Sequence, residues 1–110
     1  MATDKNFADF VASQIEEAGN IRYRKMFGEY AFYCNDKVVG LICDNQVFVK
    51  PTEAGRRFIG SDVKEAPAYE GAKNSFLIED KIEDRDWFCE LIRLTEQELP
   101  VPKKKKPKKK

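Results

Sequence analysis

Hydrophobic residues recur with helical spacing near the start of the chain. Over residues 4–18 they fall three or four positions apart, which predicts an amphipathic helix with one buried stripe. Thr3 or Asp4 is placed to cap its first turn, and Gly19-Asn20 is placed to end it. The predicted stripe comprises Phe7, Phe10, Val11, Ile15 and Ala18, and Gln14 interrupts it.

The spacing changes to that of strands over residues 28–50. The runs EYAFYC, KVVGLIC and QVFVK are separated by Asn35-Asp36 and Asp44-Asn45, two pairs that tolerate the left-handed backbone of tight hairpins. We therefore expect a three-stranded antiparallel meander. Its middle run is apolar on both faces, which is typical of a central strand with cover on each side. Gly40 in that run indicates a bulge or a close approach of two backbones.

A short helix is expected after the meander, over residues 53–59. Thr52 is a suitable cap for its start, and Gly60 stands where a helix often ends in a left-handed residue. Residues 61–74 contain Pro67 and Gly71 among mixed polar residues. This composition predicts a loop, with a short strand inside it as an open alternative.

One more strand and one more helix complete the pattern. NSFLIED (74–80) predicts a strand with Phe76 and Ile78 on one face. A helix is expected over 84–99, and its stripe comprises Trp87, Phe88, Leu91, Ile92, Thr95 and Leu99. The resulting order, α-β(3)-α-β(1-2)-α, indicates an α+β domain in which helices flank a single antiparallel sheet.

Charge divides the chain into a body and a tail. The 110 residues hold 20 Lys+Arg and 19 Asp+Glu, but residues 103–110 (KKKKPKKK) alone hold seven lysines. The remaining 13 basic and 19 acidic residues give residues 1–102 a net charge of −6. We expect residues 1–100 to form the domain and 101–110 a disordered Lys/Pro tail.

The tail has two interpretations. As a flexible arm it would bind nucleic acid nonspecifically, because lysines on such an arm contact phosphates and do not read bases. Alternatively, it aids solubility or contacts the acidic body. The candidate nucleic-acid contacts are Lys103, Lys104, Lys105, Lys106, Lys108, Lys109 and Lys110.

The chain has no histidine, which excludes Ser-His-Asp triads, Cys-His dyads and histidine metal ligands. Cys34, Cys43 and Cys89 lack metal-ligand spacing, and the six glycines are too scattered for a phosphate loop. We expect no enzyme activity, no cofactor, no metal and three buried free thiols. The absence of a signal-peptide pattern and of a long apolar run predicts a cytoplasmic protein without a membrane partner.

Residues 24–50 (RKMFGEYAFYCNDKVVGLICDNQVFVK) resemble the opening block of the TfoX N-terminal domain family, also called Sxy/TfoX. A basic residue precedes Met-Phe-Gly, and two polar turns separate an aromatic strand, a strand with Gly-Leu-Ile and a strand that ends in Lys. The resemblance continues more weakly through an aromatic loop (Tyr69, Gly71) to the last predicted helix. The motif residues are Arg24, Met26, Phe27, Gly28, Tyr30, Tyr33, Gly40 and Lys50.

The resemblance implies a fold of order α-β(3)-α-β(2)-α, similar to type III secretion chaperones. It also implies a relation to transcription or competence regulation, because longer members regulate bacterial competence with a cyclic-AMP receptor-type activator. Those members carry a second, C-terminal domain, whereas this sequence runs into its lysine tail. The family offers no established catalytic residues to transfer.

Two hypotheses about function follow. The first is a non-enzymatic regulatory interaction domain that binds an unidentified protein, with a tail that binds nucleic acid nonspecifically. The second is a chaperone-like homodimer that holds a client segment, argued from fold analogy. Self-association is open, since a small sheet with a free edge or face often pairs by two-fold symmetry. The basic and aromatic run at 22–27 is assigned to core packing in preference to base stacking.

Overall fold

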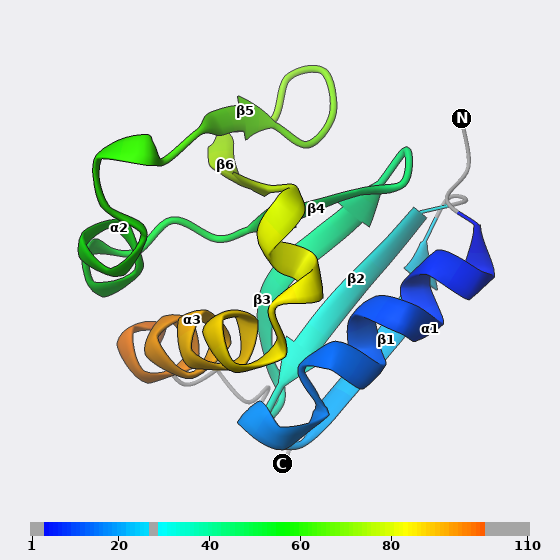
Figure 1. The fold of residues 1–110 in the computed structure, drawn as a ribbon. Coiled ribbons are helices and arrows are strands. Elements are labelled where there is room, and N and C mark those ends of the chain that lie inside the picture. The colour runs from blue at the N-terminus through cyan, green and yellow to red at the C-terminus, as the bar shows by residue number, and fades with distance from the viewer. Residues whose placement is uncertain (1–3, 27–28, 101–110) are drawn as a thin grey trace, which may run out of the picture.

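The computed structural model describes residues 4–26 and 29–100, which form three α-helices and one six-stranded antiparallel sheet (Figure 1). The helices are α1 (Lys5–Gln14), α2 (Glu53–Ile59) and α3 (Arg85–Glu98). Three short 3₁₀ turns are η1 (Glu16–Ala18), η2 (Gly60–Asp62) and η3 (Asp80–Glu83). The strands are β1 (Ile21–Met26), β2 (Glu29–Cys34), β3 (Lys37–Cys43), β4 (Gln46–Val49), β5 (Glu65–Pro67) and β6 (Asn74–Ile78).

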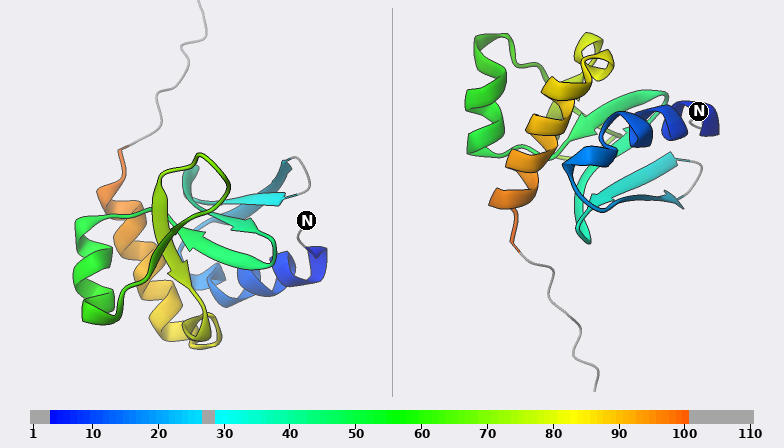
Figure 2. Two further views of the ribbon diagram at one scale, coloured as in Figure 1. Left: turned by 90° about the horizontal axis from the view of Figure 1, so that it is seen from above. Right: turned by 60° about the horizontal axis from the view of Figure 1, so that its bottom comes forward.

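The molecule has two layers, a twisted sheet and the helices that cover one of its faces. The strand order is β1-β2-β3-β4-β6-β5, and both views in Figure 2 place α1 and α3 on the same side of the sheet. The core between the layers is filled by fully buried side chains from β2, β3, β4 and β6 and from α1 and α3. The largest are Phe32, Phe76, Phe88, Ile15, Ile42, Leu91 and Ile92. The predicted α+β class is confirmed.

The predicted hairpin turns are confirmed by the backbone. Asn35, Asp36, Asp44 and Asn45 all have positive φ angles, between 53° and 71°. Asn and Asp tolerate this left-handed region better than other non-glycine residues, which is why both two-residue turns form without glycine. The turns set the register Cys34↔Lys37 and Cys43↔Gln46. As expected, the three cysteines are buried and unpaired.

Gly40 lies at a close approach of three strands. The pairing of β2 with β3 shifts register between Phe32 and Tyr33, which is a bulge beside Gly40. A Cβ atom on Gly40 would lie 2.4 Å from the carbonyl oxygen of Phe48 and 2.5 Å from the ring Cζ of Phe32. Both predicted explanations for this glycine therefore hold together.

The main difference from the sequence prediction is β1, the strand that adds a fourth member to the expected meander. It runs IRYRKM, and Tyr23 faces α1 while Arg22 and Arg24 lie on the other face. Because three of its six residues are cations, the sequence predicts that this segment lies before the sheet and not in it. An edge strand can carry charge, however, because its unpaired side faces solvent. The loop predicted over 61–74 contains β5, the short strand left open.

The first helix also departs from the prediction. It ends at Gln14 and passes into η1, so the predicted helix over 4–18 is interrupted. Phe10 is 41% exposed, which corrects its place in the buried stripe. Ala8 is buried instead, and Phe10 lies about 200° around the helix from it. The structure caps this helix with Asp4, whose side chain accepts a hydrogen bond from the Asn6 amide.

The other two helices agree closely with the sequence. Thr52 caps α2 by accepting from the Gly55 amide, and Gly60 follows with a φ of 90°. Asp84 caps α3 through the Trp87 amide. The predicted stripe of α3 is buried except for Trp87 and Leu99, which are half-buried.

Part of the prediction falls outside the described residues. Phe27 and Gly28 of the motif, residues 101–110 of the predicted tail and the seven tail lysines belong to this part. None of the described helices is both long and apolar enough to span a bilayer.

Candidate functional site

The face of the sheet turned away from the helices carries a row of apolar side chains. The register pairs Leu41 with Phe48 and Phe48 with Leu77, so the row crosses β3, β4 and β6. Alternation along the strands places these three side chains opposite the core residues Ile42, Val47 and Ile78. We call this surface the open face.

A groove forms where the loop between β5 and β6 lies against the open face. The loop covers residues 68–73 and turns through a hydrogen bond from the Ala72 amide to the Tyr69 carbonyl (3.0 Å). Between the loop and the strands is a cavity of about 370 Å³. Its lining comprises Val38, Gly40, Leu41, Phe48, Lys50, Pro51, Ala68, Tyr69, Ala72, Lys73, Asn74 and Ser75. Phe48 is only 4% exposed, so it forms a floor and not a protrusion.

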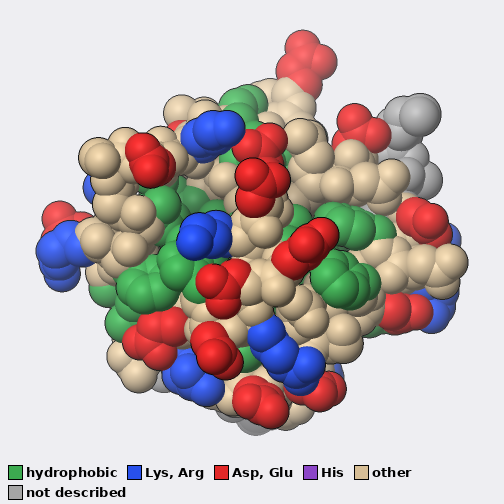
Figure 3. All heavy atoms as spheres, in the orientation of Figure 1, with side chains coloured by type: hydrophobic (Ala, Val, Ile, Leu, Met, Phe, Trp, Pro, Cys, Tyr) green, Lys and Arg blue, Asp and Glu red, His purple; other side chains and the backbone are tan. Residues whose placement is uncertain are grey.

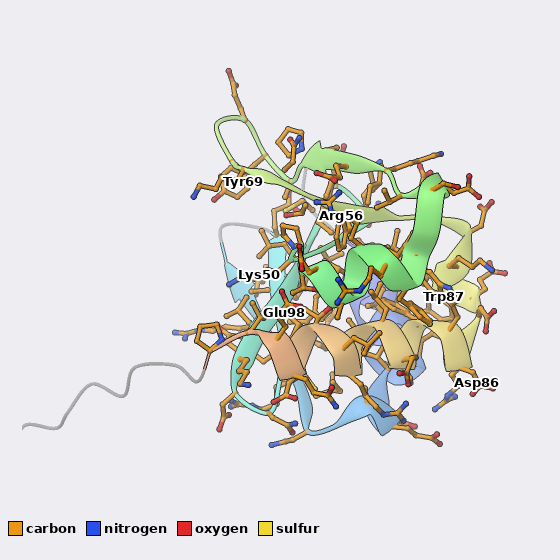
Figure 4. All side chains as sticks on the ribbon, turned by 90° about the vertical axis from the view of Figure 1, so that its left-hand side faces the viewer. Lys50, Arg56, Tyr69, Asp86, Trp87 and Glu98 are labelled. Atoms are coloured by element: carbon orange, nitrogen blue, oxygen red, sulfur yellow. The ribbon has the colours of Figure 1, made fainter. Side chains whose placement is uncertain are left out.

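Two lysines and a tyrosine stand at the rim of this groove. Tyr69 is 61% exposed, and the side chains of Lys50 and Lys73 are exposed as well. Figure 4 shows Tyr69 on the projecting loop and Lys50 on the same side of the molecule. Within the described part of the chain, neither lysine side chain has a hydrogen bond or ion pair. A ligand in the groove would therefore meet two cations with no competing partner.

These unpartnered cations stand out against the rest of the described chain. Eight cations form ion pairs with carboxylates. Lys81 lies over the Trp87 ring at 5.6 Å. The four described cations that remain are Arg24, Lys25, Lys50 and Lys73. Figure 3 shows the contrasting helix-covered face, where acidic and basic side chains are interspersed.

A second hollow, of about 320 Å³, lies between β6 and the start of α3. Its lining includes Lys64, Glu79, Lys81 and Trp87. Both of its lysines are engaged within the chain, Lys64 with Glu79 at 2.9 Å and Lys81 with the Trp87 ring. An incoming ligand would have to displace these contacts, so the groove on the open face is the better candidate.

The structure divides the sequence motif between the groove and other places. Gly40 and Lys50 line the groove, and Tyr69 of the aromatic loop stands at its rim. Tyr30 is buried in the core and packs edge-on against Tyr23, with ring centroids 5.3 Å apart. These positions give Gly40 and Tyr30 structural roles and leave Lys50 as a candidate for contact with a ligand.

The other motif residues lie on the two strands at the far side of the sheet. Arg24 lies on β1, which Met26 ends, and Tyr33 lies on β2 under the guanidinium of Arg22. They do not line the groove. The core-packing prediction for residues 22–27 rests on Met26 and Phe27, whose side chains lie outside what the structure describes. Tyr23 of the same run packs against the buried cluster, and Arg22 lies over the Tyr33 ring at 5.7 Å.

Sequence reasoning missed three groove residues, Lys73, Leu41 and Phe48. A signal was available for Leu41, because a central strand that is apolar on both faces must place side chains on the open face. The apolar run Val47–Val49 on β4 carried the same signal for Phe48. Lys73 had no such signal, since the fold of the loop alone brings it beside Lys50.

The groove combines apolar contact, two ammonium groups and an aromatic ring. The buried thiols lie elsewhere: burial raises the pKa of the Cys34 thiol to about 11, with the nearby Glu96 adding to the effect. Burial raises the pKa of Cys43 and Cys89 too. In residues 4–26 and 29–100 no three His, Cys, Asp or Glu side chains group as metal ligands.

Comparison with known proteins gives two matches. A family model described as the TfoX N-terminal domain matches residues 13–99, from within α1 to the end of α3. A protein of Spirochaeta aurantia, described as an uncharacterized 12.7 kDa protein in the trpE 5' region, is 44% identical over 108 residues. The alignment covers 98% of this chain and 93% of that protein.

Proposed function

Because this chain belongs to the TfoX N-terminal domain family, we propose that it is a non-enzymatic regulatory domain that binds a protein partner in the groove of its open face. The lysine tail adds nonspecific nucleic-acid binding. Transcription or competence regulation is the process in which such a domain would act.

The observation that carries this proposal is the rim of the groove. Tyr69 is the more exposed of the two large hydrophobic side chains exposed among the described residues, and it lies beside two unpartnered lysines. Exposed aromatic side chains are enriched at binding surfaces because they provide a large contact area at low entropic cost. Lys50 and Lys73 have no side-chain partner in the described part of the chain, whereas a ligand in the groove would contact both of them and the Tyr69 ring.

The chemistry of the groove also describes the partner. Its apolar floor suits one aliphatic or aromatic side chain, and the two lysines suit a carboxylate beside that side chain. The partner segment would therefore carry an acidic residue next to a large apolar one. The groove is open at its rim, so a protein loop can enter it without rearrangement of the sheet.

A chaperone-like homodimer is less well supported than an interaction domain. Holding an unfolded client requires a broad apolar surface. Among residues 4–26 and 29–100 only Phe10 and Tyr69 are large exposed hydrophobic side chains. Phe10 lies on α1, which covers the opposite face from the groove, so the two residues do not form one patch.

The test compares two charge reversals of equal size in affinity capture from a bacterial extract. Lys50→Glu with Lys73→Glu alters the groove, while Arg57→Glu with Lys64→Glu removes the same charge from exposed positions elsewhere. A protein captured by the native chain and by the second variant, but lost with the first, is the expected result. Equal capture by both variants would contradict the groove.

The tail is tested by a salt titration of duplex DNA binding. The full chain is compared with a chain that ends at Pro102. If all seven lysines engage the duplex, log K should fall with log salt with a slope of about −6, and truncation should abolish binding. Equal binding by both chains would remove the tail from the proposal and leave the groove unaffected.

A further inference from the structure

The strand β1 forms an edge of the sheet that lacks most of the usual protection. Exposed edges are commonly blunted by shortness, proline, a bulge or charge. The opposite edge, β5, has three residues and ends in Pro67. By contrast, β1 has six residues, no proline and a continuous register with β2. Of these protective features, β1 has only charge, so its edge could pair with a strand from another chain.

Backbone groups of alternate residues point outward from this edge. The Asn35 amide donates to the Asn20 carbonyl (2.9 Å), which fixes the hydrogen-bonded positions in this antiparallel pair. Hydrogen-bonded and non-hydrogen-bonded pairs alternate along an antiparallel ladder, so the N–H and C=O groups of Arg22 and Arg24 also point toward β2. The N–H and C=O groups of Ile21, Tyr23 and Lys25 therefore face away from the sheet.

The side chains of the edge are basic on both faces. Arg22 and Arg24 lie on the open face, and Lys25 lies on the face of α1. Arg22 donates to Asp36 at 2.6 Å, whereas Arg24 and Lys25 have no side-chain partner among the described residues. Facing the strand from α1, Asp9 accepts from the Tyr23 hydroxyl and pairs with Lys5 at 3.1 Å. No acidic residue lies on β1 itself.

Charge disfavours a second copy of this chain as the partner at the edge. In an antiparallel pairing of two β1 strands, the outward residues Ile21, Tyr23 and Lys25 must pair with one another. Centring that pairing on Tyr23 places Arg22 opposite Arg24 of the other copy, twice. The next allowed registers pair Tyr23 with Ile21 or with Lys25 of the other copy. The first places Arg22 opposite Arg22, and the second places Arg24 opposite Arg24. Like charges directly opposite each other destabilise a strand pair, and every one of these registers contains them.

We propose that β1 accepts an additional strand from a partner protein, an extended segment with Asp or Glu at alternate positions opposite Arg22 and Arg24. Strand addition satisfies the outward backbone groups, and the alternate acids pair with the arginines on the open face. A nucleic-acid phosphate would match the charge of the arginines, but it would not pair with the alternating outward N–H and C=O groups of the edge. This surface is separate from the groove, so it does not depend on the groove's function.

The test is residue-resolved amide hydrogen exchange of the full chain with a peptide as long as β1 that alternates Glu and Val. Binding should slow exchange at Ile21, Tyr23 and Lys25 and leave Arg22 and Arg24 unchanged, because those two amides already face β2. The same peptide with N-methyl groups on its bonding amides should give no protection. The tail also attracts an acidic peptide, but it cannot produce alternate protection on β1.

Two substitutions at one position separate the backbone from the charge. Lys25→Gln removes only the charge, whereas Lys25→Pro also removes the outward N–H and leaves the bonds to β2 intact. We expect Lys25→Pro to bind the peptide about tenfold more weakly than Lys25→Gln. Arg24→Glu should weaken binding by a similar factor, and Arg57→Glu should not.

Three results would overturn the proposal. The first is uniform protection or none along β1, and the second is equal affinity of the two Lys25 variants. The third is an oligonucleotide that displaces the peptide from β1 while protecting no alternate amide, which would assign the edge to phosphate binding.

Discussion

The substitution Gly40→Ala tests whether the close approach at the centre of the sheet determines the fold. The added Cβ would lie 2.4 Å from the Phe48 carbonyl oxygen, which belongs to the paired backbone of β4 and has no rotamer to change. It would also lie 2.5 Å and 2.7 Å from two ring atoms of Phe32, a side chain that is 1% exposed.

The cost of Gly40→Ala in unfolding free energy depends on the atoms that must move to accept the new Cβ. Overpacking of a core costs about 1–3 kcal/mol, and a clash with backbone belongs at the upper end. We therefore expect Gly40→Ala to lower the free energy of unfolding by about 3 kcal/mol. For a domain of this size such a loss lowers Tm by about 15 °C. Urea unfolding followed by circular dichroism measures the first quantity, and a thermal scan measures the second.

A double-mutant cycle separates the ring from the backbone. Phe32→Leu removes the two ring contacts, so the cost of Gly40→Ala should fall by about 1 kcal/mol in that background. Gly60→Ala is a contrasting control, because a Cβ there meets no atom within 4 Å and only the φ of 90° opposes it. A Gly40→Ala protein within about 0.5 kcal/mol of the native protein in unfolding free energy would show that the close approach at Gly40 does not constrain the sheet.

Three further predictions concern other parts of the fold. Thr52→Ala should cost about 1 kcal/mol in urea unfolding because it removes the cap on the Gly55 amide, and Thr52→Ser should restore it. Lys37→Ala should cost about 2 kcal/mol in the same assay, because the half-buried Glu96 carboxylate loses its ion pair at 3.2 Å and the end of α3 loses a donor to its carbonyls. The Cys34 thiol should resist alkylation at pH 8 in the folded protein and react fully in denaturant. The folded pKa of Cys34 is about 11, whereas the ordinary pKa of a cysteine thiol is 9.0. Stability should therefore fall as pH rises from 9 toward 11, because in that range only the unfolded thiol loses its proton.

A flat stability curve over that range, or rapid alkylation of the folded protein, would contradict the last prediction. Equal stability of Thr52→Ala and Thr52→Ser would contradict the prediction for Thr52. An unfolding free energy of Lys37→Ala equal to that of the native protein would contradict the prediction for Lys37.

Strong local signals made the helices, hairpins and core strands predictable. The Asn-Asp and Asp-Asn turns fix two hairpins because few residues accept a left-handed backbone. The bounds of α2 follow from Thr52 and Gly60, one of which caps the helix while the other ends it. The glycine in β3 was informative for the same reason, since an interior strand rarely lacks a side chain without cause.

Long-range placement explains what the sequence did not reveal. Half of the residues in β1 are cations, and its identity as a strand comes from pairing with β2. Phe10 fits a helical stripe by spacing, but the position of α1 on the sheet turns Ala8 inward instead. The groove depends on the 68–73 loop lying against β4, which brings Lys73 to Lys50 across more than twenty residues of chain. None of these placements is encoded by a local pattern.

The most direct test of the groove as a protein-binding site is photo-crosslinking in cells. A benzophenone-bearing phenylalanine in place of Tyr69 reports whatever protein lies at the rim, and the same residue in place of Arg57 is the matched surface control. We expect a protein crosslink at position 69 that is absent at position 57 and is lost when Lys50→Glu and Lys73→Glu are added. Identical crosslinks at both positions, or a crosslink at 69 that survives the two charge reversals, would contradict this expectation.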